Sequence, residues 1–283
     1  MLTYPNIDPV ALSVGPISIH WYGTMYMVAF LGGWWLGRVR TARPDSGWKV
    51  DDIDDLLFYM ALGIILGGRI GYTLFYGFDN LIQDPLSLFR IWEGGMSFHG
   101  GLLGVMVALT VFAKRFNRTF FECTDFVAPL IPLGLGAGRI GNFINGELWG
   151  SPTSLPWGFQ INCKAFPSVC LDTLNLAEGT LMSQALHPNQ LYEALLEGIV
   201  LFFILWLYSS RPRPAMAVSG LFLTGYGVIR FFIEFVRLPD AHIGYLAFDW
   251  FTMGQLLSVP MIFGGLTLIV LSYMRRNAVS CRE

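Results

Sequence analysis

Residues 251–274 read FTMGQLLSVPMIFGGLTLIVLSYM and hold no charged side chain. A helix of about 20 mostly apolar residues is long enough to cross the hydrocarbon core of a bilayer. The rest of the chain has a similar character, because 54% of its 283 residues are hydrophobic and only 13% are charged. Soluble domains carry about 25% charged residues. A soluble fold of this size could not bury so much apolar surface, so the sequence predicts an integral membrane protein.

Six further apolar segments precede residues 251–274. Each is about as long as a membrane-spanning helix, although several carry charged residues within the apolar run. We therefore expect an all-α, polytopic protein with about seven transmembrane helices in a single membrane-embedded domain, residues 1–283. The expected helices cover residues 18–38, 56–78, 94–113, 126–148, 191–210, 215–236 and 251–274.

The basic residues are distributed unevenly between the connections. The connections after the first, third and fifth expected helices, together with the C-terminal tail, hold 12 of the 18 Lys and Arg residues. Cytoplasmic loops carry the excess of positive charge in membrane proteins. We therefore expect a periplasmic N-terminus and a cytoplasmic C-terminus. The longest connection, residues 149–188, then lies on the periplasmic side and is long enough to form a cap over a site.

Three arginines lie inside apolar segments: Arg69, Arg139 and Arg230. Each costs roughly 2.5–3.5 kcal/mol at the centre of a helix on insertion scales, so each requires a polar partner. One interpretation is internal ion pairs with glutamates of the fifth and sixth expected helices. The other is an anion site, because the expected topology places all three arginines, and His99, at a similar depth in the outer half of the membrane. The glutamates available for ion pairs are Glu193, Glu197 and Glu234.

Four polar residues of the sixth expected helix lie on one face. Tyr226, Arg230, Glu234 and Arg237 fall within about 80° of one another at 100° per residue. Such a stripe faces protein and not lipid. The planar guanidinium group of arginine can bind two phosphate oxygens at once, so the stripe favours a phosphate site. A purely structural Glu–Arg pair is the alternative.

The fourth expected helix contains a glycine-rich motif. Residues 134–150 read GLGAGRIGNFINGELWG, in which Arg139 and Asn142 share a face. The sequence from Asn145 to Glu147 indicates that the helix loosens there. Irregular backbone at membrane depth is tolerated only where it is buried in protein or lines a cavity.

A second glycine-rich motif opens the third expected helix. Residues 94–102 read GGMSFHGGL, where four glycines flank His99. Glycines let a ligand or another backbone approach the imidazole closely. His99 is therefore either a general base, since histidine can accept a proton near neutral pH, or a hydrogen-bonding strut.

The four cysteines show no metal-ligand spacing, and we expect no metal site. Cys163 and Cys170 both lie in the expected periplasmic connection. In that oxidising compartment they could form a disulfide that closes a small loop, or they could be two free thiols. Nothing in the sequence resembles a nucleic-acid-binding module.

The motifs quoted above resemble those of the bacterial phosphatidylglycerol–prolipoprotein diacylglyceryl transferase family. The resemblance extends in order over nearly the whole chain, and its longest match covers residues 136–150. It is weakest in the periplasmic connection around the two cysteines. The other matching stretches are HWYG at 20–23, GGRIGY at 67–72, GGMSFHGGL at 94–102, HPNQLYE at 187–193 and GYGVIRFFIEFVR at 225–237.

The resemblance implies a multi-pass enzyme of the bacterial inner membrane. It implies transfer of the diacylglyceryl group from phosphatidylglycerol to the lipobox cysteine of a prolipoprotein signal peptide, which forms a thioether and releases glycerol phosphate. It implies no metal and no organic cofactor. The family's functional positions correspond here to Tyr22, His99, Arg139, Asn142, Glu147, Gly150, Tyr226, Arg230, Glu234 and Arg237.

For this reaction we expect catalytic roles for His99, Arg139 and Arg230. His99 would take the proton of the substrate thiol, and the arginines would hold the phosphate as the carbon–oxygen bond breaks. Alternatively, an Arg-rich environment lowers the pKa of the substrate thiol and His99 is structural. The expected substrate-binding residues are Tyr22, Arg69, Asn142, Asn145, Glu147, Gly150, Tyr226, Glu234 and Arg237.

A transporter or flippase is the rival interpretation. It would carry an anionic lipid or solute through the same arginine-lined cavity. We find no internal repeat in the sequence, which argues against a transporter built from duplicated halves.

Overall fold

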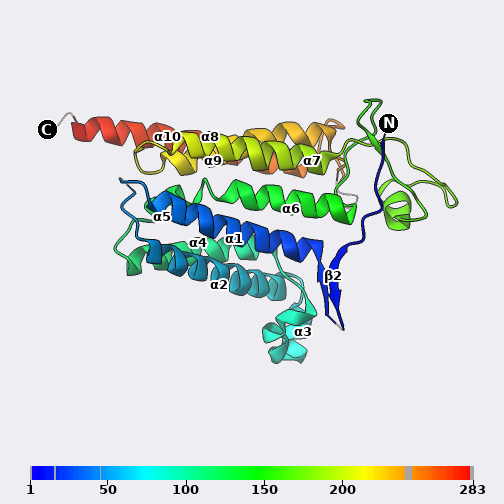
Figure 1. Cartoon of the computed structure of the whole chain (residues 1–283), viewed down its shortest axis with the longest axis horizontal. Coiled ribbons are helices and arrows are strands. Elements are labelled where there is room, and N and C mark those ends of the chain that lie inside the picture. Colours follow the sequence, from blue (N-terminus) through cyan, green and yellow to red (C-terminus); the bar gives the residue numbers. More distant parts are fainter. Residues whose placement is uncertain (1, 16, 45, 240–243, 281–283) are drawn as a thin grey trace. The chain divides into compact units, whose positions relative to one another are not determined.

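The computed structural model describes residues 2–15, 17–44, 46–239 and 244–280 of the chain. The chain is mostly helical, with a few short strands (Figure 1), which agrees with the expected helical class. It forms two compact units. Unit 1 comprises Met1–Gly33 and Ala128–Glu283, and unit 2 comprises Trp34–Val127.

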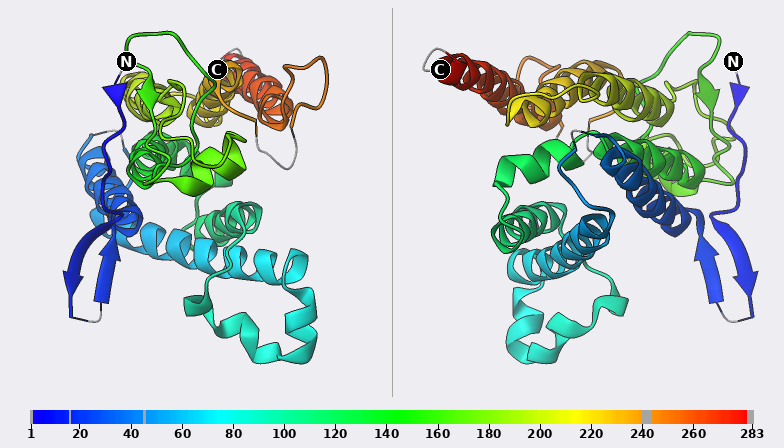
Figure 2. Two further views of the ribbon diagram at one scale, coloured as in Figure 1. Left: turned by 90° about the vertical axis from the view of Figure 1, so that its right-hand side faces the viewer. Right: turned by 60° about the vertical axis from the view of Figure 1, so that its left-hand side comes forward.

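Unit 1 contains two short strand pairs and most of the helices. Strand β1 (Leu2–Thr3) pairs in parallel with β4 (Phe159–Gln160), and β2 (Val10–Val14) forms an antiparallel hairpin with β3 (Ile17–His20), seen in blue in Figure 2. Segments α7, η4 and α8 follow one another without a break. The helices are α1 (Trp21–Thr41), which continues into unit 2, α6 (Ile131–Asn145), η3 (Val169–Thr173), α7 (Asn189–Glu193), η4 (Ala194–Val200), α8 (Leu201–Tyr208), α9 (Ala217–Ile233), η5 (Glu234–Val236) and α10 (Met253–Ser280).

Unit 2 is built on a close pair of helices, α2 (Val50–Phe75) and α4 (Phe98–Arg115). A methyl group on Gly67 would lie 2.3 Å from the backbone oxygen of Gly100, so only glycine allows this approach. Small residues are the usual means of bringing membrane helices together. The shorter helices are α3 (Phe78–Gln83), η1 (Pro85–Phe89), η2 (Ile91–Glu93) and α5 (Phe120–Val127).

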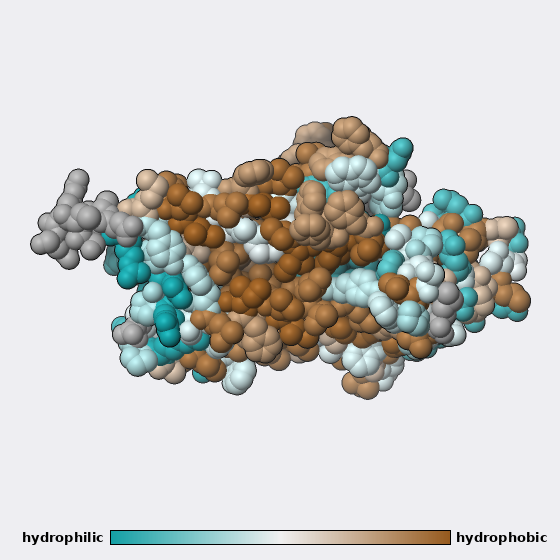
Figure 3. Space-filling model, turned by 90° about the horizontal axis from the view of Figure 1, so that it is seen from above, coloured by the Kyte–Doolittle hydropathy of each residue, from teal (hydrophilic) through white to brown (hydrophobic). Residues whose placement is uncertain are grey.

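Five helical segments of the described chain are long and apolar enough to cross a membrane, and α5 with α6 would make a sixth as one broken span. Helix α1 is not among them, since its Trp, Tyr and Gly residues lower its mean hydropathy. Many large exposed side chains are hydrophobic, and the face in Figure 3 is hydrophobic through its central part. These features confirm a multi-pass membrane protein. The five segments are Val50–Phe75, Phe98–Arg115, Asn189–Tyr208, Ala217–Val236 and Met253–Arg276.

The expected first residues of the first two helices were wrong. The first helix begins at Trp21 and not at residue 18, because the Val- and Ile-containing segment before it forms the β2–β3 hairpin. The second begins at Val50 and not at residue 56. Its first turn contains Asp51 and Asp52, whose negative charges are favourable at a helix N-terminus.

The third and fourth expected helices were also wrong in their bounds. The third begins at Phe98 and not at residue 94, because Gly94 and Gly95 have φ angles of 82° and 79°, which no helix accommodates. The fourth, expected over residues 126–148, is interrupted between α5 and α6. Pro129 and Pro132 lie at this break, and proline supplies no backbone N–H for the helical hydrogen bonds.

Helix α6 ends where the sequence indicates loosening. Its last residue is Asn145, and Gly146 follows as a left-handed C-cap with φ of 71°. Residues 149–188, the cap, then fold around a small core in which Tyr4, Trp149, Ile161 and Leu186 pack against the cysteines. The disulfide between Cys163 and Cys170 is present, which confirms that alternative.

Candidate functional site

Arg139 of α6 and Arg230 of α9 are joined by a single carboxylate in unit 1. Glu193 places Oε2 3.2 Å from Nε of Arg139 and Oε1 2.6 Å from Nη1 of Arg230. The Glu193 side chain is 0% exposed, whereas 17% of Arg139 and 12% of Arg230 remain accessible. The carboxylate therefore holds two guanidinium groups side by side, and each keeps a small exposed surface.

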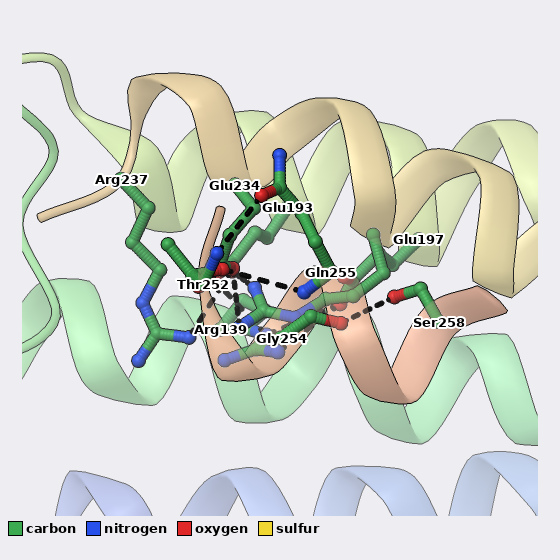
Figure 4. A network of polar contacts seen from close by, with 10 residues as sticks. Arg139, Glu193, Glu197, Glu234, Arg237, Thr252, Gly254, Gln255 and Ser258 are labelled. Atoms are coloured by element: carbon green, nitrogen blue, oxygen red, sulfur yellow. Dashed lines mark hydrogen bonds and ion pairs between the residues drawn. The ribbon is translucent and has the colours of Figure 1, made fainter. Parts of the chain in front are cut away.

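Two more glutamates extend this arrangement (Figure 4). Oε2 of Glu197 lies 3.2 Å from Nη2 of Arg139. Oε2 of Glu234 lies 2.8 Å from Nη2 of Arg230 and 3.9 Å from Nη1 of Arg237. These contacts are the internal ion pairs of the structural interpretation. They are compatible with anion binding as well, because the accessible parts of the arginines can still meet a ligand.

Glycines and a π-helix bring these charges together. A methyl group on Gly198 of η4 would lie 2.7 Å from the Cα of Gly136, so α6 and η4 can pack closely only with glycine there. This contact brings Glu197 to Arg139. A methyl group on Gly254 would lie 2.7 Å from the Glu234 carboxylate, which therefore sits against the start of α10. A helix N-terminus stabilises a carboxylate.

The turn after α6 is held by a second set of polar contacts. Asn142 and Asn145 each donate a hydrogen bond of 3.2 Å to the carboxylate of Glu147, whose side chain is exposed. Gln190 donates to the backbone oxygen of Glu147. Tyr4 donates to the backbone oxygens of Phe143 and Ile144, and burial raises the pKa of Tyr4 to about 12.

Three other predicted site residues of unit 1 lie near these groups. Gly150 donates its backbone N–H to the His187 carbonyl, and a methyl group on it would lie 2.5 Å from the Val236 oxygen. Tyr22 packs against Gly141 of α6. The Tyr226 hydroxyl lies in the electrostatic field of Arg139, Glu197 and Arg230. Gly150 therefore joins the cap to the end of α9–η5. Tyr22 lies beside α6, and Tyr226 lies beside the ion pairs.

Arg69 and His99 belong to unit 2. The buried Arg69 guanidinium donates to four backbone oxygens of the segment between α2 and α4, so it fixes that segment. Anion binding by Arg69 stays a prediction. The four oxygens that accept hydrogen bonds from Arg69 belong to Ser87, Leu88, Gly94 and Gly95.

His99 is an exposed residue of the first turn of α4, and the side chain of Ser97 caps the N-terminus of that helix.

Several contributors to the site carried no specific signal in the sequence. Glu193 and Glu197 were expected as ion-pair partners and Glu234 also as a substrate-binding residue, but the bridge that Glu193 makes between two arginines was not predicted. A π-helix, which is common at functional sites, cannot be read from composition. Tyr4 acts on the site through backbone oxygens that are far away in sequence. Among the residues that the structure describes, no group of three or more His, Cys, Asp or Glu could hold a metal ion.

Comparison with known proteins identifies the family. The family model of prolipoprotein diacylglyceryl transferase matches residues 9–271. The chain belongs to the prolipoprotein diacylglyceryl transferase family. A phosphatidylglycerol–prolipoprotein diacylglyceryl transferase of Ectopseudomonas mendocina is 55% identical over 98% of both chains. A protein of the same name from Pseudomonas fluorescens is 54% identical over 100% of both chains. Another, from Azotobacter vinelandii, is 54% identical over 97% of this chain and 98% of its own length.

Membership of the diacylglyceryl transferase family confirms the resemblance seen in the sequence motifs and shows that the chain is a transferase. It gives no support to the transporter interpretation. Of the expected site residues, the structure gathers Arg139, Arg230, Glu234 and Arg237 in one ion-pair network. Asn142, Asn145 and Glu147 form the adjoining turn.

Proposed function

We propose that the chain transfers the diacylglyceryl group of phosphatidylglycerol to the thiol of a lipobox cysteine in a prolipoprotein. The carbon–sulfur bond forms as the bond from the glycerol carbon to the phosphate oxygen breaks. The electron pair leaves with that oxygen, so glycerol phosphate departs, and the thiol proton passes to a base. His99 is our candidate base. The resemblance to the family implies no metal or organic cofactor.

The observation that carries this proposal is the pair of guanidinium groups on Glu193. Arg139 and Arg230 lie within 3.2 Å and 2.6 Å of one carboxylate and stay partly accessible. Two adjacent guanidinium groups suit a phosphate, since each fork can meet two oxygens. Charge grows on the phosphate as the carbon–oxygen bond breaks, and fixed cations stabilise that transition state.

An apolar groove beside these arginines supports a lipid substrate. It has a volume of about 240 Å³ and runs between α6 and the η4–α8 segment. Gly136 and Ile140 line it on α6, and Gly198 and Phe202 line the other side. A phosphate on the arginines would therefore have an apolar surface close by for part of an acyl chain.

We also propose seven spans, a periplasmic N-terminus and a cytoplasmic C-terminus in the bacterial inner membrane. The five apolar segments, the broken α5–α6 span and α1 add up to seven. The distribution of Lys and Arg between the connections supports the orientation. The cap and the exposed edge of the charged network would then lie on the periplasmic side, where a prolipoprotein presents its cysteine.

The test is product formation by the purified protein in detergent. We expect a lipobox peptide and phosphatidylglycerol to give a thioether-linked diacylglyceryl peptide and one glycerol phosphate per product. If the protein binds phosphatidylglycerol but no thioether forms with an active, reduced peptide, the proposed reaction is wrong. If the protein moves the intact lipid between leaflets after reconstitution into liposomes and forms no thioether, the flippase is favoured.

A further inference from the structure

A second cavity, of about 350 Å³, lies next to the charged network in unit 1, and its walls carry both apolar and charged residues. Three segments form its walls: the turn after α6, the π-helix η3 of the cap and the chain that follows η5. This cavity shares no lining residue with the apolar groove, and of the ion-paired residues described above only Arg237 lines it. Its polar lining comprises Glu147, Ser168, Asp172, Thr173 and Arg237.

The charges of this cavity favour a ligand that is not an anion. Glu147 and Asp172 contribute two carboxylates, and both residues are exposed. Arg237 is the counter-charge, but its guanidinium is also within 3.9 Å of Glu234. Negative charge therefore exceeds positive charge around the cavity. Like charges repel, so phosphatidylglycerol and glycerol phosphate, both anionic, are poor occupants. A polar or cationic peptide segment is complementary.

The cavity lies within reach of the proposed phosphate site. Arg237 follows Arg230 by seven residues, which corresponds to about 11 Å along the α9–η5 axis. An extended peptide covers roughly 3.3–3.6 Å per residue. A peptide whose cysteine meets the lipid beside Arg230 would therefore place in the cavity a residue about three positions away from that cysteine.

The charged residues of the cavity favour one side of the cysteine. Residues before the cleavage site of a signal peptide form an apolar run, which belongs in the membrane. The residues after the cysteine are the start of the exported protein and can enter a pocket with charged walls. The wall that would face them is fixed in advance, because the Cys163–Cys170 disulfide and the Leu176-to-Cys170 backbone hydrogen bond of 2.8 Å hold η3. A prearranged wall lowers the entropy lost on binding.

We propose that this cavity binds the peptide segment that follows the acceptor cysteine, and that Asp172 makes it prefer a basic residue over an acidic one about three positions later. The assignment rests on the proposed transferase reaction and deepens it by locating the second substrate. Asp172 acts by charge on the bound peptide, and it takes no part in the bond changes.

Competition between two peptides tests this assignment. Both are lipobox peptides, and they are identical except that the third residue after the cysteine is Lys in one and Asp in the other. The detergent-purified protein receives equal amounts of both peptides together with phosphatidylglycerol, and the ratio of the two thioether products is measured. Exposed charge pairs change affinity by a few-fold, so we expect the wild-type protein to favour the Lys peptide by about fivefold. Asp172→Asn should bring the product ratio near one, and Asp172→Lys should reverse it. The ratio does not depend on how much of each variant folds.

Glu178→Gln is the matched control, because Glu178 is an exposed acid of the same cap that does not line the cavity. It should keep the wild-type ratio. If the Asp172 variants also keep that ratio, the assignment is overturned while the reaction stands. It is equally overturned if Asp172→Lys lowers the KM for phosphatidylglycerol and leaves the peptide ratio unchanged, because the cavity would then bind the lipid head group. Absence of any thioether from the wild-type protein would overturn the proposed reaction, and this assignment with it.

Discussion

Glu193→Gln separates the shared carboxylate from the rest of the ion-pair network. The side chain keeps its length, but one of its two oxygens becomes an NH₂ group that faces a guanidinium donor. Breaking a buried ion pair by changing one partner costs about 3–5 kcal/mol. Glutamine retains one acceptor, so we expect a loss of about 3 kcal/mol in the free energy of unfolding. A protein of ordinary stability, about 5–15 kcal/mol, still folds after that loss.

The larger effect should be on catalysis. Glu193 is within 3.2 Å of both Arg139 and Arg230, and without it neither guanidinium is fixed relative to the other. Displacements of about 1 Å can lower a rate about 10²-fold, so we expect kcat to fall by about that factor. Glu197→Gln is the control, because Glu197 is equally buried but, within the part of the chain that the structure describes, forms an ion pair with Arg139 alone. It should lose less than tenfold.

The assay measures thioether product, the KM for phosphatidylglycerol and the Tm of each variant in detergent. We expect the kcat of Glu193→Gln to fall well below that of Glu197→Gln at a similar loss of Tm. Equal losses of activity in the two variants would refute the bridging role. So would more than a tenth of wild-type activity in Glu193→Gln, since the carboxylate would then be needed only for stability.

Three other predictions follow from the remaining sites. His99→Gln should lower kcat by about 10²–10⁴-fold with normal lipid binding, while His20→Gln should not; a loss below tenfold would make His99 structural. A reporter fused to the C-terminus should be active only as a cytoplasmic reporter, and periplasmic activity would contradict the proposed topology. Burial raises the Tyr4 pKa from 10.0 to about 12, so the stability from its hydrogen bonds is complete below pH 10 and is lost as the pH rises through about 12. The Tm difference between wild type and Tyr4→Phe should therefore be constant up to pH 10 and then shrink; a constant difference up to pH 12 would contradict this.

The membrane class and most helices could be predicted from the sequence, since apolar length is a local property. The errors lie where particular residues end or interrupt a helix within an apolar segment that is long enough to span the membrane. Gly94 and Gly95 adopt left-handed φ angles before α4, and Pro129 and Pro132 divide α5 from α6. The segment before Trp21 is apolar enough for a helix but forms a hairpin.

The candidate site could be predicted only in part. The polar stripe of the sixth expected helix indicated that Arg230 and Glu234 face protein, and their 2.8 Å ion pair agrees with that. Which glutamate bridges two arginines depends on how α6, α7 and α9 pack, and no periodicity within one helix contains that information. The same limit applies to Arg69, whose partners are backbone oxygens that carry no sequence signature.

Replacing the two arginines by lysine tests the central claim most directly. Lysine keeps the positive charge but loses the planar fork that binds two phosphate oxygens. Thioether formation, phosphatidylglycerol binding and Tm would be measured for Arg139→Lys and Arg230→Lys in the same detergent. If these arginines hold the phosphate of phosphatidylglycerol, both variants should fold and insert normally yet lose most of the transfer activity. Near wild-type activity in both would leave the arginines as structural ion-pair partners of Glu193, Glu197 and Glu234 and would contradict the proposed phosphate site.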